Sequence, residues 1–240
     1  LLSGDHGRIA RARRDQALTR TVERRPDMIR ALDPAGLDRE DRALLARLGW
    51  AVPAGADHPV PVRLRNATAD DAHALAELAA RTFPDACGNV IDPEFLERHI
   101  ATNLVPELFA TWADDDRVDL VVAELLEPSS VQEPSHGAPA GASTAPALVG
   151  YAAVLREEVD SEGEQPHGID PRPACVRPVG GEVVGELSKV YVDAAMRGSG
   201  LTPALMDAVM RQAAVHGTSL FWLGTHVTNK RAQKAYKRAG

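Results

Sequence analysis

The sequence predicts a protein of the α/β class, in which helices cover a β-sheet, preceded by a small all-helical segment. The main evidence is a strand–turn–helix unit. Residues 187–192 are apolar and β-branched enough for a buried strand, and a tight glycine-bearing turn follows at 197–200. A helix with Pro203 in its first turn starts there and stops at Gly217. Residues 1–50, in contrast, carry helix signals only.

The other elements follow from local signals of the same kind. A capping-box pattern at 68–71 predicts a helix start, and Pro106 predicts a break in the helical stretch 93–114. Residues 83–92, with proline, glycine and asparagine, predict a loop. We expect strands at 61–65, 118–126, 148–159, 187–192 and 220–224, and N-terminal helices over 9–24, from Pro26, and after a cap at Asp38.

Composition divides the chain into parts. We expect a helical tail at 1–50, a linker at 51–60 and one domain at 61–240. Residues 127–147 are too poor in apolar side chains to order themselves, so we expect a mobile insertion there. A second insertion, 160–181, is rich in proline and glycine but also carries charges.

Overall composition excludes several classes of protein. The 240 residues are 44% hydrophobic, 4% aromatic and carry a net charge of −7, which allows a real core and gives no global nucleic-acid signal. Cys87 and Cys175 lack metal-ligand spacing, so we expect no metal site and a reducing, cytoplasmic compartment. No apolar run approaches the ~18 residues of a membrane span, and no signal peptide is visible.

The glycine turn is the first candidate site. A strand, a glycine turn and a helix start direct backbone N–H groups and the positive end of the helix dipole at an anion. Arg197 adds a cation beside Gly198 and Gly200. On its own such a turn indicates phosphate binding weakly, because glycine turns that need only a positive φ are common.

Two motifs make the signal specific. The stretch V-Y-V-D-A-A-M-R-G-S-G-L-T resembles the pyrophosphate motif of the GNAT acetyltransferase superfamily, Gln/Arg-x-x-Gly-x-Gly/Ala, except that Thr202 stands at the last position. Asn229, Ala232, Tyr236 and Gly240 match the closing motif of the same superfamily. The resemblance covers roughly residues 61–240 and implies a mixed central sheet with flanking helices, an α+β arrangement.

The resemblance also implies acetyl-CoA as the cofactor and assigns roles to residues. Tyr236 matches the general acid that protonates the leaving thiolate. In many relatives a Glu acts as the general base at the position where this chain has Gly224, and in others at the position of Glu186. His226 or a base that acts through water stay open as alternatives. The implied cofactor-binding residues are Val190, Tyr191, Val192, Arg197, Gly198, Ser199, Gly200, Leu201, Thr202 and Asn229.

The N-terminal segment has its own pattern. Between Arg8 and Arg25 there are seven arginines against two acidic residues, whereas the whole chain is acidic. The first thirty residues resemble the start of the C-terminal helical domain of the bacterial tRNA guanine methyltransferase, with Ala12 where that family usually has Trp. The resemblance implies a tRNA contact; on charge alone a solvated basic helix is the simpler interpretation.

The sequence therefore predicts an acetyl-CoA-dependent N-acetyltransferase. The acceptor would be a primary amine, either a small amine or polyamine or a protein N-terminus, and an acidic body suits a cationic acceptor. Two alternatives remain: a degenerate acetyltransferase fold that only binds, and an accessory to a tRNA-modifying enzyme. The chain starts at Leu1 and stops at Gly240, so we expect a piece of a longer product whose acetyltransferase domain is incomplete at its C-terminus. The sequence leaves the oligomeric state open.

Overall fold

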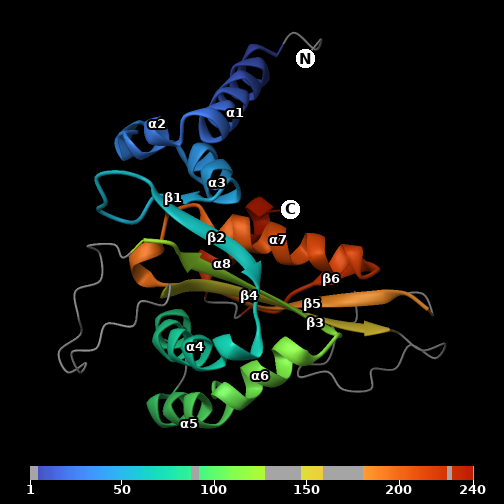
Figure 1. Cartoon of the computed structure of the whole chain (residues 1–240). Helices are drawn as coiled ribbons and strands as arrows, with labels where there is room; N and C mark the ends of the chain where they lie inside the picture. Colours follow the sequence, from blue (N-terminus) through green and yellow to red (C-terminus); the bar gives the residue numbers. More distant parts are fainter. Residues whose placement is uncertain (1–4, 88–91, 128–146, 159–180, 226–228, 240) are drawn as a thin grey trace.

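A six-stranded sheet forms the centre of the computed structural model (Figure 1), which describes residues 5–87, 92–127, 147–158, 181–225 and 229–239. The strands lie in chain order, and all neighbours are antiparallel except β5 and β6, which are parallel. They are β1 (Trp50–Ala51), β2 (Val60–Asn66), β3 (Val118–Leu125), β4 (Ala147–Glu158), β5 (Val183–Val192) and β6 (Thr218–Trp222). The parallel pair makes the sheet mixed, as predicted. A parallel pair requires a crossover connection, and α7 (Leu201–Val215) provides it.

Helices cover both faces of this sheet (Figure 1). The helices α4 (Ala72–Cys87), α5 (Pro93–Asn103) and α6 (Pro106–Asp114) lie on one side, with α7 on the other. The last helix, α8 (Lys230–Ala239), packs against α7. Strands buried on both faces read as continuous apolar runs, which is why β3 and most of β4 are recognisable in the sequence.

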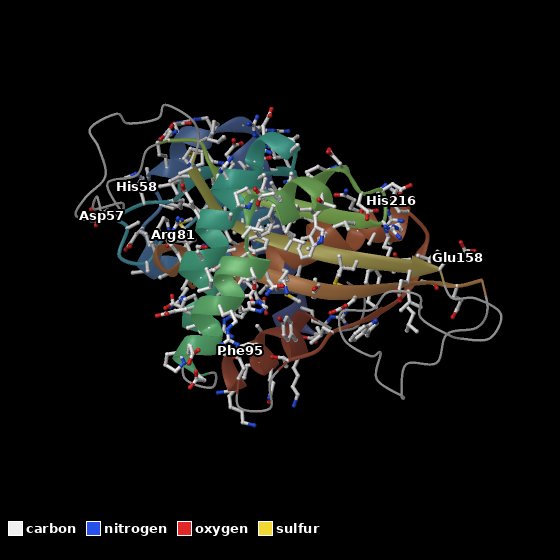
Figure 2. All side chains as sticks on the ribbon, turned by 90° about the horizontal axis from the view of Figure 1, so that it is seen from below. Asp57, His58, Arg81, Phe95, Glu158 and His216 are labelled. Atoms are coloured by element: carbon white, nitrogen blue, oxygen red, sulfur yellow. The ribbon has the colours of Figure 1, made fainter. Side chains whose placement is uncertain are left out.

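Each face of the sheet has its own apolar cluster. Leu187, Leu205 and Val209 belong to the cluster under α7, whereas Phe109 and Tyr151 belong to the cluster under α4 and α6. At the end of α7, the His216 ring (labelled in Figure 2) lies 2.7 Å from buried Asp119 of β3, which also accepts a 2.8 Å hydrogen bond from Arg156. These contacts fix α7 across the sheet.

The N-terminal helices form a small unit with a core of its own. The helices α1 (His6–Arg24), α2 (Pro26–Arg30) and α3 (Arg39–Arg47) enclose Leu18, Ile29 and Leu45. The expected linker 51–60 differs from a free connection, because its first residue belongs to β1, which pairs with β2. The unit is thereby continuous with the sheet.

Two local features differ from the sequence-based expectation. The loop predicted for 83–92 is wrong in its first half, because α4 continues through Pro84 to Cys87. Phe83 is buried on this helix, and its packing outweighs the hydrogen bond that Pro84 cannot donate. The break before Pro106 is confirmed by the separate helices α5 and α6. Most of the two predicted insertions, at 128–146 and 159–180, lies outside the described residues.

Candidate active site

The central feature of the site is an incomplete strand pair. β5 pairs with β6 only as far as Glu186, opposite Trp222, whereas its pairing with β4 continues to Val192. Ser188 is the extra residue of a β-bulge, because Leu187 and Lys189 pair with consecutive residues of β4. A bulge bends and twists its strand. The second half of β5 therefore has an open backbone edge on the side of β6.

The direction of the backbone groups along this edge follows from one hydrogen bond. The N–H of Asp193 donates to the carbonyl of Val149 at 2.9 Å, so it is directed toward β4. Because these directions alternate along a strand, the N–H of Tyr191 also faces β4, whereas those of Val190 and Val192 face the open edge. Two of the three predicted pantetheine contacts thus expose their backbone N–H groups to the gap.

The glycine turn follows this strand after Asp193 and one turn of 3-10 helix, Ala194–Met196. Gly198 and Gly200 have φ angles of +76° and +93°, which disfavour other residues. The buried Ser199 hydroxyl accepts a 3.3 Å hydrogen bond from the N–H of Leu201 at the start of α7. Within the described residues, the N–H groups of Gly198 and Thr202 have no protein acceptor, and nothing lies within 4 Å of a Cβ placed on Gly198. These free donors suit an anion at the N-terminus of α7.

Gly200 makes a close contact that the motif does not indicate. A Cβ at this position would overlap the backbone carbonyl of Arg42 in α3 and lie 2.8 Å from the backbone nitrogen of Ala43. Glycine is therefore required here because the N-terminal unit packs against the turn, and the sequence motif alone gives no sign of this.

Arg197 is held from the side of the sheet that α4 covers. Its guanidinium forms an ion pair with Asp85 of α4, while Arg81, one helical turn earlier, lies 3.4 Å from Asp193. The Nε atom of Arg197 is buried and has no partner within the described residues. A cation with donors to spare therefore lies beside the turn.

The predicted residues of the C-terminal helix lie at its start and middle. The side-chain oxygen of Asn229 accepts a 3.0 Å hydrogen bond from the N–H of Ala232, so this residue caps α8. Tyr236 is half-buried against the cluster under α7, and burial raises the pKa of its phenol above the ordinary value of 10.0. Among the described residues its hydroxyl has no hydrogen-bond partner, which leaves the proton available.

The face of β5 that packs against α4 lies beside a group of residues that sequence reasoning missed. His99 of α5 stacks on Phe83, with ring centroids 4.8 Å apart, and on Phe95 at 6.0 Å (Phe95 is labelled in Figure 2). Phe83 also meets Tyr191 at 6.3 Å. Burial and the nearby charge of Lys189 lower the pKa of His99. The available signal was the spacing of Phe95 and His99, four residues apart on one helix face.

Glu186, the predicted base, lies on this same face. It is half-buried and stands opposite Leu155, which packs against the cluster under α4 and α6. Gly224 follows β6 in an exposed position, and His226 lies outside the described residues. The structure thus brings Glu186 to the end of the β5–β6 pairing, where the strand edge opens.

The residues present fit a phosphate-bearing cofactor. Free N–H donors and the space beside Gly198 lie at the positive end of α7, and Arg197, whose Nε has no partner among the described residues, directly precedes Gly198. The open edge of β5 lies a few residues earlier in the chain. Fold and site together define a transferase that holds an extended, phosphate-bearing carrier along a sheet edge.

The comparisons with known proteins agree with this class. The family model described as "Acetyltransferase (GNAT) family" matches residues 106–240, more than half of the chain. The chain belongs to the GNAT acetyltransferase family, which confirms the predictions of an acyltransferase and of acetyl-CoA as its cofactor. The PaiA N-acetyltransferase of Thermoplasma acidophilum, solved with coenzyme A, has the same fold: the TM-score is 0.52 at 12% identity, over 75% of this chain and 88% of that one.

The N-terminal region matches a second group of proteins. A tRNA (guanine-N(1)-)-methyltransferase of Kocuria rhizophila is 67% identical over 52 residues, 22% of this chain and 16% of that protein. The Salinispora arenicola enzyme of the same name is 62% identical over 55 residues, 23% of this chain and 21% of that protein. The chain therefore spans about a fifth or less of these relatives. The predicted resemblance is confirmed for this short region.

A further family model, "T3SS (YopN, CesT) and YbjN peptide-binding chaperone 3", matches residues 4–102. This range joins the N-terminal unit to β2, α4 and most of α5. Among the helices that the structure describes, none has the length and apolar character to cross a membrane. The same described residues contain no group of three or more His, Cys, Asp or Glu that could hold a metal ion.

Proposed function

We propose that this protein transfers the acetyl group of acetyl-CoA to a primary amine, either a small amine or polyamine or a protein N-terminus. The observation that carries the proposal is the open edge of β5 together with the turn that follows it through a short 3-10 helix and has free N–H donors at the start of α7. A long carrier with a phosphate-bearing end and a reactive end fits both parts at once.

The proposed roles follow from position. When bound, acetyl-CoA supplies an activated thioester. The N–H groups of Val190 and Val192 are available to stabilise negative charge that develops on a carbonyl oxygen at the strand edge. Arg197 and the N–H groups of Gly198 and Thr202 bind the phosphates. Ser199 and Leu201 shape the turn through their mutual hydrogen bond.

Proton transfer is assigned to two side chains. Tyr236 holds a proton at its hydroxyl and donates it to the leaving thiolate. Glu186, on the face of α4–α6, takes a proton from the substrate ammonium, directly or through water, and the neutral amine that this leaves attacks the thioester carbonyl. Asn229 caps α8 and so fixes the helix that carries Tyr236. The acceptor therefore approaches from the side of His99 and Phe83.

A charge test at Gly198 addresses cofactor binding. Asp and Asn both tolerate a positive φ and have the same shape, so Gly198→Asn is a matched control for Gly198→Asp. We expect calorimetry to show acetyl-CoA affinity at least about tenfold weaker for Gly198→Asp than for Gly198→Asn, because a carboxylate would face the phosphates. Equal affinities would contradict phosphate binding at this turn.

Turnover is tested by release of the CoA thiol in the presence of a panel of polyamines, small amines and N-terminal peptides. Amine-dependent release in the parent is the expected result. Acetyl-CoA binding without turnover on any amine would favour the alternative of a binding module.

The N-terminal arginines support a second, separate proposal of contact with tRNA. Arg11 and Arg14 are held by Asp41 of α3, which reduces the predicted basic surface. Arg13, Arg20 and Arg24 are exposed, and their spacings of seven and four residues place them on one face of α1.

If these three cations meet phosphates, tRNA affinity should fall about 10²–10³-fold for a tenfold rise in salt. Replacing all three by alanine should remove most of that dependence, whereas Arg211→Ala on α7 should not. Filter binding at several salt concentrations measures this. An affinity that is independent of salt, or no binding at low salt, would support the simpler interpretation of a solvated helix.

A further inference from the structure

The last two turns of α4 contact both halves of the active site. Two ion pairs connect α4 to the cofactor turn: Arg81 pairs with Asp193, and Asp85 pairs with Arg197. Arg81 and Asp85 are four residues apart on α4, and their partners are also four residues apart in the chain, so the two contacts reinforce one register (Arg81 is labelled in Figure 2). α4 is therefore fixed to the turn at two points.

The turn side of this connection is itself rigid. Besides contacting Arg81, the Asp193 carboxylate accepts a 3.1 Å hydrogen bond from the N–H of Ala195 and so caps the short 3-10 helix 194–196. The backbone N–H of Asp193 is bonded to Val149 of β4. A displacement of Arg197 or Asp193 is thus passed to α4 instead of being absorbed by a flexible loop.

The other side of the same helix meets the acceptor face. Phe83 lies between Arg81 and Asp85 in sequence; its ring is buried, stacks on His99 and contacts Tyr191. Movement of α4 along its ion pairs therefore changes the packing of the His99 ring. Close-packed side chains transmit such shifts because they leave few voids to absorb them.

The geometry points to Asp85 as a positioning residue that orients Arg197 toward the phosphates and, through α4 and Phe83, relays cofactor binding to His99 at the acceptor face. This inference rests on the proposed binding of the cofactor at the glycine turn. A guanidinium has five donors in a fixed fork, and Asp85 engages only its Nη2 side. The Nε–H of Arg197 is buried without a partner among the described residues, and a phosphate that reaches it would share one rigid cation with Asp85.

The test uses the whole chain with CoA itself as the probe. Histidine side chains are labelled with ¹³C at Cε1, and the His99 signal is assigned by its absence in His99→Gln. The NMR shift of His99 and its titration midpoint are recorded without CoA and at saturating CoA, with calorimetry defining saturation for each variant. Asp85→Asn is compared with Asp85→Glu and with Asp207→Asn, which breaks an exposed ion pair on α7.

In the parent, CoA should shift the His99 signal and its midpoint. Asp85→Asn should lose that response while still binding CoA; Asp85→Glu and Asp207→Asn should keep it. If Asp85→Asn does not fold, Arg81→Gln tests the second pair of the same connection.

A full His99 response in Asp85→Asn at saturation would overturn the relay and leave the proposed function standing. A loss of response in Asp207→Asn as well would also overturn it, and a parent that binds no CoA would overturn both proposals.

Discussion

At the scale of single residues, Tyr236 shows how burial prepares a side chain for proton transfer. Its ring packs against the apolar side of α7, and desolvation raises the pKa of its phenol. A group whose neutral form is favoured stays protonated throughout the neutral pH range. The hydroxyl can therefore donate to a thiolate, whose conjugate acid has an ordinary pKa near 8.5.

Removing this hydroxyl alone tests its role. Tyr236→Phe keeps the ring packing, so the melting temperature and acetyl-CoA affinity should hardly change, whereas kcat should fall about 10²-fold or more. The KM for acetyl-CoA should stay near that of the parent. Steady-state kinetics with the best amine of the panel measures both constants. A variant that turns over within twofold of the parent would make Tyr236 a packing residue and water the proton donor.

At the scale of elements, the pairing of α1 with α3 depends on a buried carboxylate. Asp41 is buried and accepts hydrogen bonds from Arg11 at 2.6 Å and from Arg14 at 3.1 Å. Desolvation alone would raise the pKa of Asp41, but the hydrogen bonds and charges of the two arginines lower it overall. Part of the basic pattern predicted to be solvated or RNA-bound is thus used inside the unit.

This pair predicts a specific pH dependence. Because the folded pKa lies below the unfolded value of about 3.9, the contribution of Asp41 to stability is present above that pH and is lost as pH falls through the folded pKa. Asp41→Asn should therefore be less stable than the parent by about 1–3 kcal/mol at pH 7. Urea unfolding at several pH values measures the difference, which should shrink below about pH 4. A difference that is constant down to pH 3 would contradict this account.

Most elements were predictable because their causes are local. The central strands β3 and β4 were visible because both of their faces are largely buried, and the motif placed the glycine turn between β5 and α7. The bulge at Ser188 and the continuation of α4 through Pro84 were not predictable. Both depend on packing between distant segments, and neither leaves a signal in the neighbouring sequence.

At the scale of the whole molecule, the N-terminal unit is joined to the acetyltransferase fold at several points. The N–H of Ala54 donates to the carbonyl of Ala195 at 2.9 Å, and Arg30 forms a salt bridge with Glu127. The backbone of α3 lies directly against Gly200. The sequence predicted a separate tail and a linker, because composition changes near residue 50 and contacts across that boundary are not encoded locally. The cofactor turn therefore has α4 on one side and α3 on the other.

The two glycines of the turn allow this docking to be tested. Gly198→Ala and Gly200→Ala both introduce a Cβ at positive φ, which costs roughly 1–2 kcal/mol by itself. Only at Gly200 does that Cβ also collide with the backbone of Arg42, whereas nothing lies within 4 Å of it at Gly198. Gly198→Ala is thus the matched control for backbone strain.

The expected outcome is selective loosening of the N-terminal unit. In Gly200→Ala, amide hydrogen exchange in α3 should accelerate at least about tenfold relative to Gly198→Ala, which corresponds to about 1.4 kcal/mol of local opening free energy. Exchange in β3 and β4, in the centre of the sheet, should change equally in both variants. Mass spectrometry of proteolytic peptides covering α3 and the strands measures this difference. Equal exchange of α3 in the two variants would mean that the unit is held by β1 and the Arg30 salt bridge, and that its contact with the turn contributes nothing measurable.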